Sequence, residues 1–156
     1  MYATRYNATV TISIVGGVDT AITTHANPDV LGASWLSVRT GPGLTYCDHA
    51  RTVAGVAAAW NNAFAKARRL LPVEADLPDT SAVAVAQINA GIDDTWDVTG
   101  AAARAAHDGI GFLSVRIGAL TVRCHDQRAV EALHEIWREA ALVGHVMWRP
   151  RGVHRM

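Results

Sequence analysis

The stretch Trp35-Leu-Ser-Val-Arg-Thr40 returns in the second half of the chain as Phe112-Leu-Ser-Val-Arg-Ile117. The same offset in sequence number aligns further identical residues, some of them of rare types: Gly41 with Gly118, Cys47 with Cys124, Arg51 with Arg128, Val53 with Val130 and Trp60 with Trp137. Nearer the start of each half the offset is shorter by three, which aligns Ile14 with Ile88, Gly17 with Gly91 and Asp19 with Asp93. Self-similarity at a fixed period is typical of an internal repeat. We therefore predict a duplicated chain with three residues inserted in the second half, between Asp94 and Gly109.

Each copy of the repeated stretch begins a predicted β-hairpin. Residues 35–40 and 44–47 flank the turn Gly41-Pro42-Gly43, and residues 112–117 and 119–124 flank a tighter turn at Gly118. Polar and apolar residues alternate over residues 6–15, which predicts an earlier strand. Residues 82–90 are its weaker counterpart, and residues 18–24 form a further candidate strand. The alanine-rich residues 97–107 favour a short helix that carries the insertion.

A long helix is predicted after each hairpin. Apolar residues follow the helical period over residues 50–71, and the same stripe returns over residues 127–143. Asp48 and Asp126 stand just before these stripes, where a carboxylate can accept hydrogen bonds from the free backbone N–H groups of the first turn. Gly144 favours the end of the second helix. Trp60 and Trp137 lie on the apolar stripes, and we interpret both as core anchors between helix and sheet.

These elements predict an α+β fold. Its two halves, each a β-sheet with a C-terminal helix, would be related by pseudo-twofold symmetry, with mostly antiparallel strands and one long helix per half. The first repeat spans residues 1–71 and the second residues 81–148. Residues 72–80 contain two prolines and acidic side chains, which indicate a linker between the repeats. Residues 149–156 form a short basic tail.

Composition and charge narrow the function classes. The chain has 156 residues, half of them apolar, and 14 basic residues balance 14 acidic ones. Zero formal charge argues against a protein that coats duplex DNA nonspecifically. No apolar run approaches the roughly 20 residues that span a bilayer. The N-terminus lacks the charged-then-apolar order of a signal peptide, and two cysteines are too few for a disulfide framework. We expect a cytoplasmic protein with no membrane partner.

The face that the helices leave uncovered is the most informative feature of the predicted fold. Because side chains alternate along a strand, covering one face determines which residues lie on the other. The order aromatic–Ser–Arg occurs there in both halves, as Trp35, Ser37 and Arg39 and as Phe112, Ser114 and Arg116, and the second strands add Tyr46 and Arg123. Rings stack on bases, and guanidinium groups pair with phosphates. We hypothesise a non-enzymatic module that binds single-stranded DNA or RNA through six residues: Trp35, Arg39, Tyr46, Phe112, Arg116 and Arg123.

The same composition has a second interpretation. The uncovered face could instead pack against the other half or a second subunit, with Arg39 and Arg116 paired to carboxylates. The chain would then be a structural or regulatory protein that homodimerises or holds a protein partner through this face. Zero net charge counts against nucleic acid, although a neutral protein can carry a local basic patch.

The two cysteines have three possible roles. Cys47 and His49, and Cys124 and His125, occupy the same strand-to-helix junctions and contain zinc-ligand chemistry, but neither half has a Cys-x-x-Cys or His-x-x-x-His spacing. A helix N-terminus and a nearby histidine would activate a thiol nucleophile. However, the alternation along their strands places both cysteines on the core-facing side. This favours the third role, in which each cysteine is a small buried hydrophobic residue. The sequence predicts no cofactor, no metal site and no catalytic group.

Overall fold

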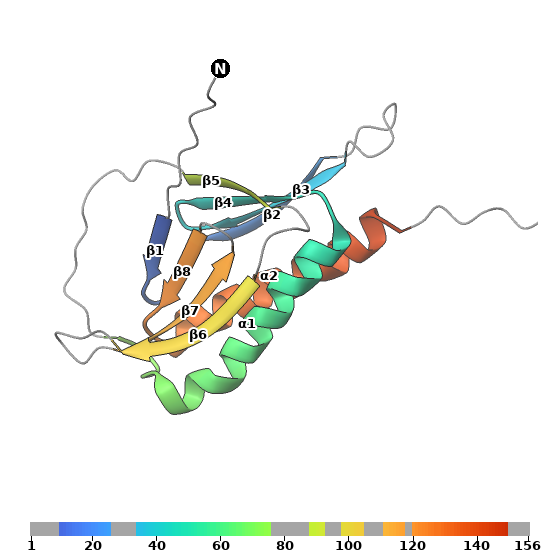
Figure 1. Ribbon diagram of the computed structural model, residues 1–156. Coiled ribbons are helices and arrows are strands. Elements are labelled where there is room, and N and C mark those ends of the chain that lie inside the picture. Colours follow the sequence, from blue (N-terminus) through green and yellow to red (C-terminus); the bar gives the residue numbers. More distant parts are fainter. Residues whose placement is uncertain are drawn as a thin grey trace, which may run out of the picture.

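A computed structural model describes residues 10–25, 34–75, 88–92, 98–104, 111–117 and 120–149. These residues form two four-stranded sheets and two long helices, so the predicted α+β class is confirmed (Figure 1). The elements follow the chain as β1 (Val10–Ile14), β2 (Thr20–His25), β3 (Trp35–Thr40), β4 (Gly43–Cys47), α1 (Ala50–Leu70), β5 (Ile88–Ile92), β6 (Val98–Arg104), β7 (Gly111–Ile117), β8 (Leu120–Cys124) and α2 (Gln127–Met147).

The two sheets exchange one strand between the halves of the sequence. The first sheet has the order β2-β3-β4-β5, and the second has the order β1-β8-β7-β6. β1 therefore leaves the first half to pair with β8, and β5 leaves the second half to pair with β4. Both exchanged strands run parallel to their neighbour, whereas every other pair is antiparallel. Because the exchange joins segments far apart in sequence, neither sheet is complete without both halves.

The pairing registers correct the expected alignment of the early strands. The repeated stretch aligns Thr40 with Ile117. Thr20 lies opposite Thr40 in the first sheet, and Val98 lies opposite Ile117 in the second. By position in the sheets, Thr20 therefore corresponds to Val98. The exchanged strands give the same offset, because Val10 pairs with Leu120 as Ile88 pairs with Gly43. Val10 therefore corresponds to Ile88, and the predicted alignment of Ile14 with Ile88 is wrong. A few matched residues in a short segment do not determine a register.

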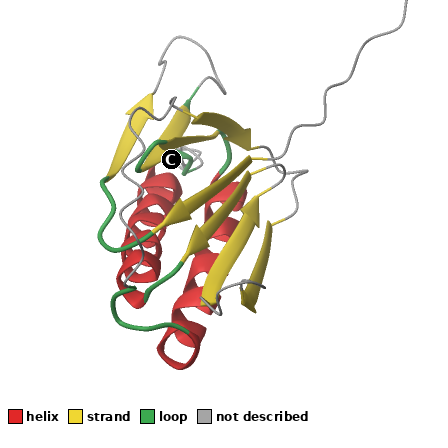
Figure 2. Ribbon diagram, turned by 90° about the vertical axis from the view of Figure 1, so that its left-hand side faces the viewer, coloured by secondary structure: helices red, strands yellow, loops and turns green. Residues whose placement is uncertain are grey.

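Each helix covers the sheet whose central hairpin comes from the other half. α1 packs on β6 and β7, α2 packs on β2 and β3, and the two helices pack against each other. Figure 2 shows both helices on the same side of the strands. The buried positions of α1 recur in α2 at the constant offset of the repeated stretch: Thr52/Ala129, Val53/Val130, Val56/Leu133, Ala59/Ile136, Trp60/Trp137, Ala63/Ala140 and Ala67/Gly144. The prediction of both tryptophans as core anchors is confirmed.

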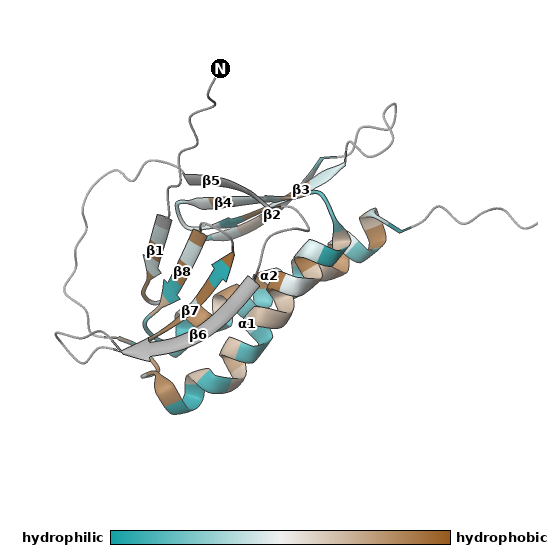
Figure 3. Cartoon of the chain, in the orientation of Figure 1, coloured by the Kyte–Doolittle hydropathy of each residue, from teal (hydrophilic) through white to brown (hydrophobic). Residues whose placement is uncertain are grey.

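The hairpin strands alternate between core and surface as predicted. The helix-facing residues of β7 and β8 are buried, and those between them are more exposed. Figure 3 shows both hydrophobic and hydrophilic residues along these strands. β3 and β4 follow the same alternation, except that Ser37 of the outward set is buried. Apolar burial of this kind contributes about 25 cal/mol per Å². The uncovered side of each sheet is called the outer face below.

Two secondary-structure predictions are wrong. Residues 98–104 form β6 and not a short helix, because pairing with β7 along the whole segment satisfies the backbone groups that a helix would otherwise satisfy internally. Alanine's helix propensity amounts to less than about 1 kcal/mol per residue, and tertiary pairing overrides it. α2 also continues through Gly144 to Met147, because Trp148 packs on this glycine: a Cβ added there would lie 2.9 Å from the Trp148 ring.

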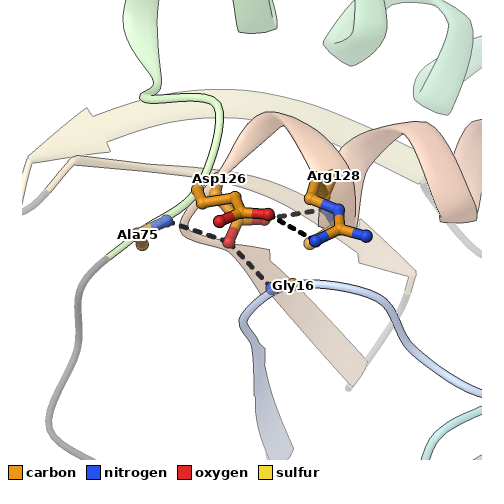
Figure 4. A network of polar contacts seen from close by, with 6 residues as sticks. Gly16, Ala75, Asp126 and Arg128 are labelled. Carbon is orange, nitrogen blue, oxygen red and sulfur yellow. Dashed lines mark hydrogen bonds and ion pairs between the residues drawn. The ribbon is translucent and has the colours of Figure 1, made fainter.

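The two helices begin differently. Asp126 caps α2, as predicted, by accepting a hydrogen bond from Ala129 N at 2.8 Å. Its carboxylate also accepts from Gly16 N at 2.8 Å and from Ala75 N at 3.1 Å, so one side chain joins three segments (Figure 4). Asp48 is exposed and is not the cap of α1: the N-cap is His49, which makes no side-chain capping bond. The exchanged order of the two residues, Asp-His in one half and His-Asp in the other, explains the difference.

Some predictions fall outside the described residues. They concern the strand over residues 6–9, the strand over residues 82–87, the turn at Gly118, most of the predicted linker and the tail over residues 150–156. Across the described ranges, neither helix is long and apolar enough to cross a membrane.

Candidate nucleic-acid interface

The six sequence-predicted residues all lie on the outer faces, and none is fully buried. Trp35, Tyr46, Phe112 and Arg123 are half-buried, and the other two, Arg39 and Arg116, are exposed. Trp35, Arg39 and Tyr46 belong to the first sheet, and the remaining three belong to the second. Within the described ranges, the three aromatic rings are therefore not sealed inside the core.

Three aromatic rings, two stacked and one edge-on, lie together on the outer face of the first sheet. The register places His25 opposite Trp35, and their rings stack with a centroid distance of 3.5 Å and an interplanar angle of 13°. The Tyr46 ring meets Trp35 edge-on at 5.1 Å and 61°. We call His25, Trp35 and Tyr46 the ring cluster. His25 is exposed and therefore presents an aromatic surface at the edge of the cluster.

A second cluster occupies the outer face of the other sheet. The Arg123 guanidinium carbon lies 4.6 Å from the centroid of the Phe112 ring, which is a cation–π contact. The His125 ring approaches Phe112 edge-on at 6.0 Å. Arg123 Nε and His125 Nδ1 are buried, and neither has a hydrogen-bond partner in the described part of the chain. We call Phe112, Arg123 and His125 the arginine cluster. It contains two buried polar atoms without a hydrogen-bond partner among the described residues.

Sequence reasoning missed both histidines. His25 and His125 contribute rings to the two clusters, and neither follows the aromatic–Ser–Arg pattern on which the prediction depended. A signal for His25 was nevertheless present, because antiparallel pairing of residues 18–24 with the hairpin would bring the end of that strand near Trp35. For His125, which lies between a strand and a helix, the sequence pattern does not indicate the direction of the side chain.

The structure does not bring Arg39 and Trp35 together. They share a face of β3 but lie four residues apart, a separation of about 13 Å along a strand. A ligand that touches both would therefore have to be extended. Arg116 lies at the same position of β7 relative to Phe112, and it does have an interaction partner.

The two cysteines are free and buried in the core, as the parity of their strands predicts. Burial raises the pKa of the Cys47 thiol from 9.0 to about 12, and the nearby Asp48 carboxylate adds to the shift. Burial, followed by the charge of Asp126, also raises the pKa of the Cys124 thiol. A thiol held in its neutral form is a poor nucleophile and a poor metal ligand. Among the described residues, no group of three or more His, Cys, Asp or Glu side chains is placed to hold a metal ion.

An open pocket of about 500 Å³ lies where β4 leads into α1. It is lined by residues of this junction and by the residue that ends α2: Asp48, His49, Ala50, Arg51 and Trp148. No sequence pattern indicates this pocket, because Trp148 and Arg51 lie in opposite halves of the sequence.

No protein-family model matches the chain, and neither a curated protein nor a solved structure matches it.

Proposed function

We propose that this protein is a non-enzymatic module that binds single-stranded DNA or RNA on its outer faces. One observation carries the proposal: accessible aromatic rings gather in the ring cluster and the arginine cluster, one on each sheet, with arginines on the same faces. Base stacking on such rings contributes about 1–3 kcal/mol per base, and it tolerates every base. Extended single strands also match the separation between Trp35 and Arg39, which compact ligands do not span.

We further infer that the chain is an internal duplication with pseudo-twofold symmetry. Three features support this: equal strand order in the two sheets, one exchanged strand in each, and the buried helix positions that recur at a constant offset. Two copies of one unit would present two platforms to a single strand. Linked sites raise the overall affinity because the second contact is intramolecular.

The proposal also places the protein in the cytoplasm. The two free, buried thiols support a reducing compartment, because cysteines in oxidising compartments are mostly paired.

The proposal is tested with a labelled single-stranded oligonucleotide, measured by fluorescence anisotropy at two salt concentrations. Trp35→Leu and Phe112→Leu are each expected to weaken binding by about 5- to 100-fold, which corresponds to about 1–3 kcal/mol for one lost stacking contact. Arg39→Gln is expected to reduce the slope of log affinity against log salt by about 0.7. Phe64→Leu is the matched control, because Phe64 is an aromatic residue on α1 that stacks on His134, away from the outer faces.

Two results would contradict the proposal. One is no oligonucleotide binding even at low salt, and the other is an equal loss in Phe64→Leu and Trp35→Leu. A stable dimer that ignores oligonucleotides and dissociates in Trp35→Ala would instead support the alternative, in which the outer face holds a second copy or a protein partner.

A further inference from the structure

The pocket at the β4–α1 junction and the ring cluster lie at the same end of the first sheet. Tyr46 precedes Asp48 by two residues, so their Cα atoms lie within about 7 Å of each other. Trp35 and His25 occupy the same end of the first sheet, because Leu36, next to Trp35, lies opposite Cys47. Figure 1 shows this end of β4 leading directly into the start of α1, beside the end of α2. We therefore expect an extended ligand that leaves the ring cluster over the end of β4 to approach the pocket.

The lining of the pocket suits one nucleotide. Trp148 supplies an aromatic wall that is half-buried, and Arg51 and His49 are exposed side chains with basic nitrogens. Arg51 is exposed and makes no ion pair within the described ranges, and a guanidinium group is a strong phosphate ligand. Asp48 also lines the pocket, and its carboxylate would repel a bare phosphate ion. It would accept hydrogen bonds from the N–H groups of a base or from the 2′-hydroxyl of a ribose, which favours a nucleotide over inorganic phosphate.

The equivalent position at the start of α2 is occupied by the chain itself. Gln127 N donates to Pro72 O at 2.9 Å, and Gln127 Nε2 donates to Leu71 O at 2.8 Å. Arg128, the counterpart of Arg51 in the repeat, forms an ion pair with Glu74. The two arginines thus occupy matching positions on matching helices, one engaged with a carboxylate and one without such a partner in the described ranges.

We propose that this pocket is the subsite for one nucleotide of the bound strand, with its base against Trp148 and its phosphate at Arg51. The proposal rests on the proposed function, because it requires the strand to continue from the ring cluster. To the proposed function it adds a binding site outside both sheets. It also adds the direction in which the bound nucleic acid leaves the first sheet.

The test compares Arg51→Gln with Arg128→Gln, using the full chain and a labelled oligothymidylate. Loss of one phosphate contact in Arg51→Gln is expected to lower the salt slope by about 0.7 and to weaken binding several-fold. Arg128→Gln is expected to change neither quantity. Trp148→Leu, which removes the ring wall, is expected to weaken binding at all salt concentrations with little change in slope.

The outcomes separate this proposal from the function on which it rests. If the wild-type chain binds no oligonucleotide, the proposed function fails and the subsite fails with it. If the wild-type chain binds and Trp35→Leu is weakened, but Arg51→Gln matches Arg128→Gln, only the subsite is overturned. Thermal unfolding of each variant identifies any loss of binding that comes from misfolding, and Arg51 is an exposed residue whose replacement should leave the fold intact.

Discussion

Asp126 is a fully buried carboxylate whose hydrogen-bond partners are three backbone N–H groups. These groups belong to the loop after β1, to the segment after α1 and to the first turn of α2. Because the three segments are distant in sequence, Asp126 acts as a tertiary tie as well as a helix cap. Its removal leaves one buried and two partly buried N–H donors without this acceptor, which costs more than the loss of an exposed cap.

We expect Asp126→Ala to lower the free energy of unfolding by about 2–4 kcal/mol in urea denaturation. Asp48→Ala is the matched control at the start of α1, where the aspartate is exposed and makes no capping bond. It is expected to change the free energy of unfolding by less than about 0.5 kcal/mol. Equal effects of the two substitutions would contradict the role assigned to Asp126.

The buried thiols predict a loss of stability in alkali. The folded chain holds the pKa of Cys47 near 12, whereas the unfolded chain releases the thiol proton near 9.0. Above about pH 9 the unfolded state therefore binds fewer protons than the folded state, and the free energy of unfolding falls as pH rises. Each thiol contributes up to about 1.4 kcal/mol per pH unit, and Cys124 acts in the same direction.

Urea denaturation between about pH 7 and about pH 11 measures this slope. The double variant Cys47→Ala/Cys124→Ala is expected to be less stable at neutral pH, because it loses packing, but to show a flatter decline above about pH 9. Parallel curves for the double variant and the wild-type chain would show that the thiols do not cause the decline.

The C-terminal turn of α2 differs from the sequence prediction, because the helix continues past Gly144. Leu71 is buried directly after α1, and Trp148 holds the same position directly after α2. The larger ring is accommodated because Gly144 stands where α1 has Ala67. The glycine that ordinarily ends a helix here provides space for a side chain, and the helix continues past it.

Two glycine-to-alanine substitutions should therefore act in opposite directions. Gly55→Ala in α1 is expected to raise the free energy of unfolding by about 0.5–1 kcal/mol, because a Cβ there meets no atom within 4 Å and alanine is the better helix former. Gly144→Ala is expected to give no gain or a loss of about 1 kcal/mol, since its Cβ would lie 2.9 Å from the Trp148 ring. Thermal and urea unfolding measure both effects. A gain in Gly144→Ala equal to that in Gly55→Ala would contradict the packing role of Trp148.

At the level of the whole molecule, the two halves are interlocked. Each sheet contains a strand from the other half, and each helix covers the other half's hairpin. Neither half can bury its apolar surface alone, so partial unfolding of one half would expose the core of the other. The interlocking predicts a single cooperative unit.

We expect one unfolding transition in calorimetry, with equal calorimetric and van't Hoff enthalpies. Val56→Ala in α1 and Leu133→Ala in α2 occupy matching buried positions, and each is expected to lower the midpoint of the whole transition. Two separate transitions, with each substitution shifting only one, would show that the halves unfold independently.

Local patterns were sufficient to predict several elements. The strands of both hairpins, both helices and the inward direction of Cys47, Cys124 and Trp60 agree with the sequence analysis, because strand alternation and helical periodicity are properties of short segments. The outward direction of the six candidate residues follows from the same alternation. The strand over residues 98–104 was mispredicted, because its alanines carry no alternating pattern and only pairing with β7 decides their conformation.

The amino-acid sequence by itself determined the repeated hairpin and helix, the faces of their residues and the positions of the rings and arginines. Only the tertiary structure decided which sheet β1 and β5 join, which helix covers which hairpin and that Trp148 meets Arg51 at one pocket. The physical reason is that the alternation of residues along a strand determines which face is apolar. It does not determine which neighbouring strand completes the backbone hydrogen bonds. That choice depends on the total burial and backbone pairing of the whole chain, which no single segment contains.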